Sequence, residues 1–272
     1  EPYRRQRQMC IRDRVLTAND LVTYDTSTYE TISIAEEKFT SAILSVTSDK
    51  IPTVYFLEGY SDFSLSKNIS GTYNSARIAA EELSESFPDR KIRLIDALNA
   101  SLAQGILAIY ASEMRAKGMS LEETADILST YPAKMNGVFT VGDLKYLSRT
   151  GRISSSAALV GNLLNIKPIL RGNKDGFIVQ FKKCRGRKAA LNTLVSLVCD
   201  NIVNPEEQII GIAHADSYED SLYVMEEIRK RVKLRGFINT SYDYCTGSHV
   251  GPDTIALFFM AKDRELGEGK QG

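Results

Sequence analysis

Helix-like and strand-like stretches alternate along this chain, and the alternation limits it to folds in which helices pack against a sheet. In the first half, apolar residues recur with helical spacing in 73–87 and 101–118, and a strand-like stretch at 91–96 separates them. A further helix pattern at 120–131 precedes an apolar strand pattern at 137–141. This order predicts an N-terminal α/β domain with a mostly parallel sheet.

Local signals mark the ends of these helices. Pro88 stops the first helix, because proline cannot continue the backbone hydrogen bonding. Gly118 ends the second helix. Ser120, with Glu123 three residues later, matches the capping box that begins a helix.

The second half combines a hairpin with helices. Two strand-like runs flank Asn-Lys-Asp-Gly at 173–176, a turn sequence typical of hairpins. Helix patterns follow at 188–203 and 217–233, and strand patterns at 208–215, 237–244 and 254–260. We therefore expect a C-terminal α+β domain. The domain boundary is placed near Lys134, so that the two domains span 15–134 and 135–266.

The first residues do not fit this scheme. The stretch EPYRRQRQMCIRDR is rich in arginine and has neither helical nor strand periodicity. We predict that residues 1–14 are a non-native tail, translated from read-through sequence and joined to a truncated N-terminal domain. In the segment that follows, 31–44 has roughly helical spacing, and Thr31 or Ser33 is a suitable helix cap.

Composition narrows the function classes. The chain has 272 residues, which favours two domains. Lysine plus arginine and aspartate plus glutamate both number 34, so there is no global attraction to nucleic acid. The four cysteines form no CxxC pair, which argues against a zinc site or a disulfide framework and favours the reducing cytoplasm. No apolar run reaches the roughly 18 residues of a membrane span, and no signal peptide is evident.

Ser70, Gly71 and Thr72 lie just before the helix pattern at 73–87. Hydroxyls and free backbone N–H groups would converge there, and a helix N-terminus attracts a carboxylate or a phosphate. The simpler interpretation is that Ser70 or Thr72 only caps the helix.

Histidine is rare in this chain. His249 lies in a Gly/Pro-rich turn before the last strand pattern, and His214 follows the apolar strand residues IIGIA at 209–213. Ligand groups gather at the ends of strands in α/β proteins, although a turn histidine can also bond only to backbone. The pair Thr47-Ser48 is a weaker candidate, since such pairs are usually caps or turns.

Two basic clusters remain. Arg149, Arg152 and Lys167 bracket an apolar segment at 157–164. It is either a short core helix with solvated flanks or an apolar wall with a basic rim, which would suit an amphiphile with an anionic head. The second cluster, KKCRGRK at 182–188, is either a solvated face or a surface for an acidic partner or a phosphate.

Several of these motifs together resemble the DegV family of fatty-acid-binding proteins, the lipid-carrying subunits of bacterial fatty acid kinase. SGTYNSA, LSRTGRIS with NLLNIKPIL, RGRKAA, IAHADSYEDSL and SHVGP occur in the family's order and approximate spacing, from about Leu16 to Arg264. The resemblance implies two domains with a fatty acid buried between them. It also implies a carrier without catalytic residues, metal or cofactor, whose partner is an ATP-dependent kinase subunit. Peripheral contact with the membrane for lipid exchange is compatible with this role, and binding of nucleic acid is not expected.

The resemblance also assigns residues. The carboxylate would be held by hydroxyls, backbone N–H groups and an imidazole, at Thr47, Ser48, Ser66, Ser70, Gly71, Thr72 and His249. The acyl tunnel would be lined by Ile153, Leu159, Leu163, Leu164 and Ile166. Arg185 would face the partner kinase and its phosphoryl group.

The sequence departs from the family at Asp253, which stands where a second glycine follows the His-x-Gly-Pro turn. The family's first strand is also missing. Two other functions stay open on the residues alone. One is a hydrolase with Ser70 as nucleophile and His249 as base, for which Asp253 and Asp216 are only guesses at the orienting acid. The other is an interaction module that uses the basic cluster.

Overall fold

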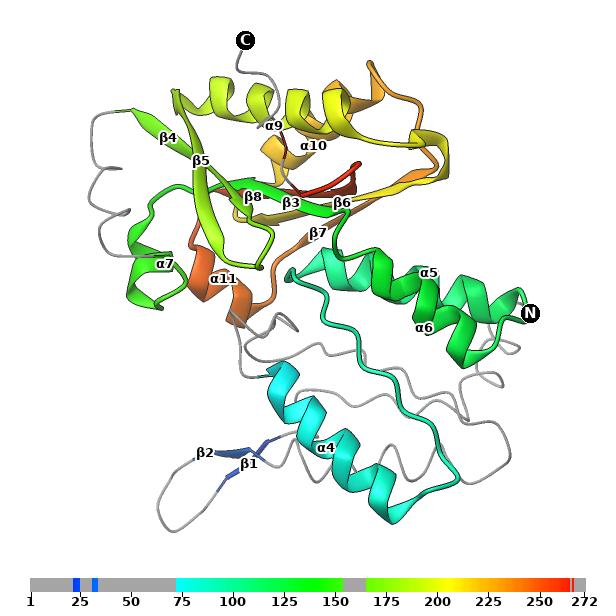
Figure 1. The fold of residues 1–272 in the computed structure, drawn as a ribbon. Helices are drawn as coiled ribbons and strands as arrows, with labels where there is room; N and C mark the ends of the chain where they lie inside the picture. Colours follow the sequence, from blue (N-terminus) through cyan, green and yellow to red (C-terminus); the bar gives the residue numbers. More distant parts are fainter. Residues whose placement is uncertain (1–21, 25–30, 34–71, 154–164, 265, 267–272) are drawn as a thin grey trace, which may run out of the picture. The chain divides into compact units, whose positions relative to one another are not determined.

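The computed structural model describes residues 22–24, 31–33, 72–153, 165–264 and 266 (Figure 1). The chain divides into two compact units, Glu1–Phe56 with Ser84–Ile92 and Leu57–Leu83 with Arg93–Gly272, and each is considered by itself. The larger unit contains a six-stranded sheet with helices on both faces, so the expected mixed α/β fold is confirmed. The predicted domain limits at residues 14, 134 and 266 stay predictions.

The sheet of the larger unit has the strand order β5-β4-β3-β8-β6-β7. Neighbouring strands are antiparallel except β6 and β7, which are parallel. The six strands are β3 (Met135–Thr140), β4 (Ile166–Gly172), β5 (Ile178–Arg185), β6 (Ile209–Ala215), β7 (Gly236–Ser241) and β8 (Thr254–Met260). This mixture of a hairpin, an antiparallel centre and one parallel pair agrees with the α+β pattern of the second half.

Helices cover both faces of this sheet (Figure 1). Helices α9 and α10 lie on one face, here called the α9 face, and α5, α7 and α11 lie on the other, the α7 face. Helix α6 packs against α5. The described helices are α4 (Thr72–Ser86), α5 (Leu102–Ala116), α6 (Leu121–Thr130), α7 (Lys145–Arg149), α9 (Arg187–Asn201), α10 (Tyr218–Arg229), α11 (Tyr244–Val250) and the 3₁₀ turn η1 (Pro205–Glu207).

The local signals are confirmed where the structure describes them. The Ser120 hydroxyl accepts the Glu123 N–H at 3.3 Å, and the Glu123 carboxylate accepts the Ser120 N–H at 2.9 Å, so the capping box forms. Strands β4 and β5 form the expected hairpin. In its turn, the Asn173 side chain accepts the backbone N–H groups of Asp175 and Phe177.

Two expectations in the first half are wrong. Thr31 and Ser33 cap no helix: they lie in strand β2 (Thr31–Ser33), which pairs antiparallel with β1 (Val22–Tyr24). Residues 91–96 form no strand, because no described segment supplies the backbone partners that a strand requires. The rest of the predicted N-terminal sheet falls largely outside the described residues, so its mostly parallel character stays a prediction.

The main core lies on the α9 face. Apolar side chains of α9 and α10 pack on alternate residues of the central strands, among them Ile210, Ile212, Ile255 and Leu257, which are fully buried. Helix α5 packs closely on the other face: a Cβ on Gly211 would lie 3.0 Å from Leu102 Cβ. The glycine in β6 therefore lets α5 approach the sheet.

A buried arginine stabilises the end of the sheet where β3 starts. The Arg264 side chain is 3% exposed, and its N–H groups donate to four backbone carbonyls, those of Leu98, Pro132, Met135 and Asn173. These carbonyls belong to segments far apart in the sequence. Burial lowers the pKa of Arg264 to about 10.

Candidate functional site

Several of the motifs singled out in the sequence lie at one end of the six-stranded sheet, here called the site end. Strands β3, β5, β6 and β7 finish there, and β4 and β8 start there, as the register pairs Ile166–Arg185 and Ala215–Thr254 show. The segments GRIS, NIKPIL, RGRK and SHVGP follow or precede these strand ends. The fold therefore gathers residues that are up to about a hundred positions apart in the sequence.

His249 belongs to the last turn of helix α11, not to a turn as the sequence predicted. Asp243 caps the N-terminus of this helix: its carboxylate accepts the N–H groups of Cys245 and Thr246 at 2.8 and 2.9 Å. The Gly/Pro-rich turn comes just after it. The helix was missed because Gly247, Ser248 and Gly251 are turn formers, although Asp243 is a recognisable N-cap.

The turn after His249 is fixed by a close contact with α7. Gly251 has a φ of +77°, and a Cβ at this position would overlap the ring of Tyr146. Helices α7 and α11 are in contact. The motifs KYLSRTG and SHVGP are thus neighbours in space, and His249 lies two residues from the point of contact.

An apolar cluster lies beside these two helices on the α7 face. It consists of Val141, Leu144, Leu147, Ile153, Leu170 and Val250, all at most 8% exposed. The predicted tunnel residue Ile153 is therefore in this cluster. Ile166, the other predicted tunnel residue in the described part of the chain, is half-buried. It lies on the same face as Leu170, because alternate residues of a strand share a face.

The two arginines of RGRK have different surroundings. The Arg187 guanidinium pairs with the Asp220 carboxylate at 2.6 Å and donates to the backbone carbonyl of Asp253 at 2.6 Å. It thereby joins the starts of α9 and α10 to the turn before β8. Arg185 is exposed and makes no ion pair or hydrogen bond within the described residues. Sequence reasoning singled out Arg185 and missed the structural role of Arg187, whose signal is its position at the start of a helix.

Each of the three cations around GRIS contacts another group of the protein. The Lys167 ammonium donates to the backbone carbonyl of Gly142 at 3.2 Å, and the Arg152 guanidinium donates to that of Thr150 at 2.5 Å. The Arg149 guanidinium lies over the Tyr146 ring, 5.4 Å from its centroid. These three side chains therefore stabilise the loops of the site end.

Two titratable groups, the partly buried Tyr242 and the buried His214, lie near α11. The Tyr242 hydroxyl bonds to the side chain of Ser101, and burial raises the pKa of this phenol. His214, at the end of β6, is 8% exposed, and burial lowers the pKa of its imidazole, against the opposing effect of the Asp216 charge. Tyr242 N–H donates to the His214 carbonyl at 2.8 Å, so the two residues join β6 to the start of α11.

Asp253 stands in a backbone conformation that favours glycine. Its φ is +58°, in the left-handed region, which explains why a glycine is the easier residue at this position. A Cβ on Gly142 would lie 3.1 Å from an Asp253 carboxylate oxygen, so this carboxylate lies against the loop after β3.

The remaining predicted site residues are not tested. Thr72 is the first residue of α4. The others lie outside the described residues: Thr47, Ser48, Ser66, Ser70, Gly71, Leu159, Leu163 and Leu164. Their approach to His249 stays a prediction, as does the Ser70–His249 pair of a hydrolase.

Two classes of feature are missing from the part of the chain that the structure describes. It contains no group of three or more His, Cys, Asp or Glu side chains that could hold a metal ion. None of its helices is both long enough and apolar enough to span a bilayer.

Comparison with known proteins gives consistent matches. A family model described as an uncharacterised protein of the DegV family matches residues 20–262. A DegV domain-containing protein of Clostridium perfringens is 42% identical over 200 residues, which cover 74% of this chain and 69% of the relative.

Solved structures share the fold. One is a DegV family protein from Ruminococcus gnavus with vaccenic acid, at a TM-score of 0.67 and 20% identity, covering 87% of this chain and 89% of the other. Another is the fatty acid kinase B3 protein of Streptococcus pneumoniae, loaded with linoleic acid. It matches with a TM-score of 0.65 and 21% identity, over 72% of this chain and 69% of the other.

Proposed function

Because the chain belongs to the DegV family, we propose that it binds a long-chain fatty acid and presents the carboxylate to a partner kinase, which converts it to an acyl phosphate. The strongest support is the position of His249, in the last turn of α11 and next to Val250 of the buried apolar cluster. An imidazole beside apolar side chains suits a ligand with an acidic head and a hydrocarbon tail. The structures from R. gnavus and S. pneumoniae carry ligands of this kind.

The energetics favour non-covalent binding. Each methylene group that leaves water contributes about 0.8 kcal/mol, so a 16-carbon chain contributes on the order of 10 kcal/mol before the entropy of association is subtracted. An unpaired carboxylate in the same surroundings would cost several kcal/mol. Hydroxyls, backbone N–H groups and His249 are suitable donors to offset this cost.

The carrier itself needs no catalytic residue in this scheme. One carboxylate oxygen attacks the γ-phosphorus of ATP, the bond from that phosphorus to the β,γ-bridging oxygen breaks, and ADP leaves. The exposed guanidinium of Arg185 is suited to face the transferred phosphoryl group, because arginine pairs well with phosphate oxygens. Loading and release of the lipid would involve transient contact with the membrane surface, in a protein that works in the cytoplasm.

The test is native mass spectrometry of the protein purified from bacteria. We expect a bound mass of a 16- to 18-carbon fatty acid, and acyl phosphate when the kinase subunit and ATP are added. An empty protein that instead hydrolyses acyl esters, and loses this activity in Ser70→Ala, would replace the carrier function with the hydrolase.

A further inference from the structure

Strand β5 carries three exposed cations that form no ion pair with a described residue, although the Lys182 ammonium lies over the Phe181 ring, 5.1 Å from its centroid. Lys182, Lys183 and Arg185 are exposed and make no ion pair or hydrogen bond within the described residues. Other cations of the same unit differ: Lys230 pairs with Glu227 and Arg235 with Glu113. The uncompensated charge on β5 can therefore receive an acidic partner.

The strand is also at the edge of the sheet. Among the described strands, β5 pairs only with β4, so its outer backbone N–H and C=O groups are available to a further segment. Lys182 pairs in register with Ile169 of the α9-face core, and Arg185 pairs with Ile166 on the α7 face. The side chains of Lys182 and Arg185 therefore point to opposite faces of the sheet at this edge.

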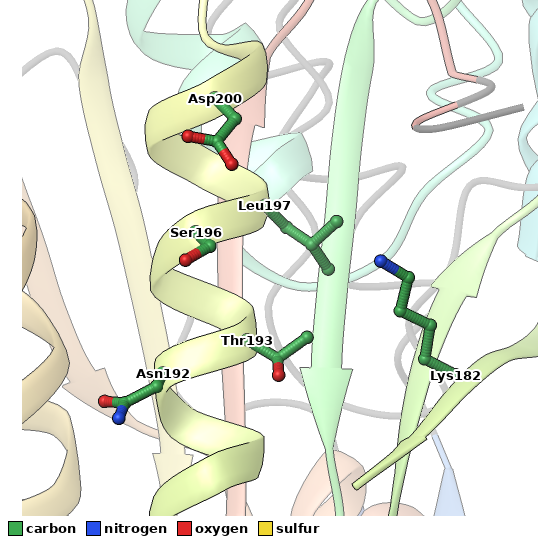
Figure 2. Close-up of a pocket in the computed structure, with 6 residues that line it drawn as sticks. All are labelled: Lys182, Asn192, Thr193, Ser196, Leu197 and Asp200. Atoms are coloured by element: carbon green, nitrogen blue, oxygen red, sulfur yellow. The ribbon is translucent and has the colours of Figure 1, made fainter. Parts of the chain in front are cut away.

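A groove continues this edge on the α9 face (Figure 2). It has a volume of about 310 Å³ and is lined by Lys182 of β5 and by Asn192, Thr193, Ser196, Leu197 and Asp200 of α9. Figure 2 shows the Lys182 side chain extending from β5 toward the helix. The lining is polar except for Leu197, which suits side chains of another protein better than a hydrocarbon tail.

The hydrogen bonds of the groove define what fits into it. The Asn192 side-chain oxygen accepts from the Tyr223 hydroxyl at 2.6 Å, and the Ser196 hydroxyl accepts from Arg231 at 3.2 Å. In these bonds Asn192 and Ser196 act as acceptors, so the Asn192 amide N–H groups, the Ser196 O–H and the Lys182 ammonium remain to donate. A carboxylate is the matching acceptor. Asp200, two helical turns from Thr193, provides an acceptor for a cation at the other end.

We propose that an acidic segment of the partner kinase docks along the β5 edge, with one carboxylate at Lys182, a second carboxylate at Lys183 and a basic side chain at Asp200. This inference depends on the proposed function, because it assigns the surface on which the kinase binds. Arg185 lies three residues from Lys182 on the same strand, so a segment docked here would lie about 10 Å from the residue expected to face the phosphoryl group.

The test uses the fatty-acid-loaded protein and the kinase subunit of the same bacterium. Lys182→Glu and Lys183→Glu should each weaken kinase binding at least about tenfold, and Asp200→Lys about threefold or more. Lys117→Glu is the matched control, because Lys117 is exposed directly after α5, which packs on the other face of the sheet, and it should leave the affinity unchanged. Carbodiimide treatment of the complex should join Lys182 or Lys183 to a kinase carboxylate.

The outcomes separate the two proposals. If the parent protein carries fatty acid and supports acyl phosphate formation, but all variants bind the kinase equally, the docking surface is wrong. If Lys183→Glu instead only causes self-association in sedimentation, the lysines protect the edge of the sheet and do not bind the kinase. A parent protein that carries no fatty acid contradicts the proposed function itself.

Discussion

The ring of Tyr146 occupies the space that a side chain on Gly251 would need. This contact joins α7 to the turn after α11, and the left-handed φ of Gly251 adds a second requirement for glycine. The position of His249 therefore depends on two residues that are 105 positions apart in the sequence.

Gly251→Ala should destabilise the protein by about 2–4 kcal/mol, because it adds both backbone strain and overlap with Tyr146. Gly118→Ala is the matched control for strain alone: its φ is +83°, but no atom lies within 4 Å of the added Cβ. It should cost only about 1–2 kcal/mol. Urea unfolding of both variants measures the difference. Equal losses of unfolding free energy in the two variants would show that Tyr146 moves away from the added Cβ at no energetic cost.

His249→Ala should weaken fatty-acid retention about tenfold to a hundredfold, the effect of one hydrogen bond to a charged group. The melting temperature of the empty protein should change much less. Ser248→Ala, at the exposed preceding residue, should retain the parent affinity. A displacement assay with a fluorescent fatty acid gives the affinities. Unchanged affinity in His249→Ala would remove this residue from the site.

Arg185→Ala should leave fatty-acid binding intact and reduce acyl phosphate formation about tenfold or more, since it removes a cation from the phosphoryl group. Arg229→Ala, an exposed arginine on α10, should have no effect on either quantity. If Arg185→Ala loses the lipid instead, this residue belongs to the binding site or to the fold.

Arg264→Met should destabilise the larger unit by roughly 3–5 kcal/mol, because four backbone carbonyls lose a buried, charged donor. Arg235→Met removes an ion pair with Glu113 that is partly exposed on both sides, and it should cost less than about 1 kcal/mol. Chemical unfolding monitored by far-ultraviolet circular dichroism compares the two. Similar losses of stability in the two variants would mean that water replaces Arg264 as the hydrogen-bond donor to these carbonyls.

Acidification should destabilise the fold through His214. Burial lowers the pKa of this imidazole below its ordinary value of 6.5, so the unfolded chain takes up the proton at a higher pH than the folded one. The free energy of unfolding should therefore fall as the pH drops below about 6.5. His214→Gln should reduce this fall, which melting temperatures between pH 7 and pH 5 will show. An identical pH profile in the variant would exclude His214 as the cause.

The sequence was sufficient to predict those local features that neighbouring residues determine. The capping box of Ser120 and Glu123 and the turn after Asn173 are such cases, since their hydrogen bonds close within a few residues. The prediction of a strand at 91–96 was wrong, because a strand requires a hydrogen-bonding partner elsewhere in the chain. At α11, the glycines outweighed the single capping signal of Asp243.

The site was predictable only as a list of residues. Nothing local in SHVGP or KYLSRTG indicates that Gly251 and Tyr146 touch. In RGRK, the one local signal that distinguishes the paired Arg187 from Arg185 is its position at the start of helix α9. These properties depend on the order of the strands, which brings β4, β5 and β8 to the same end.

Strand β8 comes last of the six in the sequence but lies between β3 and β6. Until it is synthesised, the hairpin half and the parallel half of the sheet have no strand to connect them, and two interior edges face solvent. We expect that this sheet is assembled after translation of its final strand, and that a nascent chain stalled before Thr254 is a substrate for chaperones or proteases.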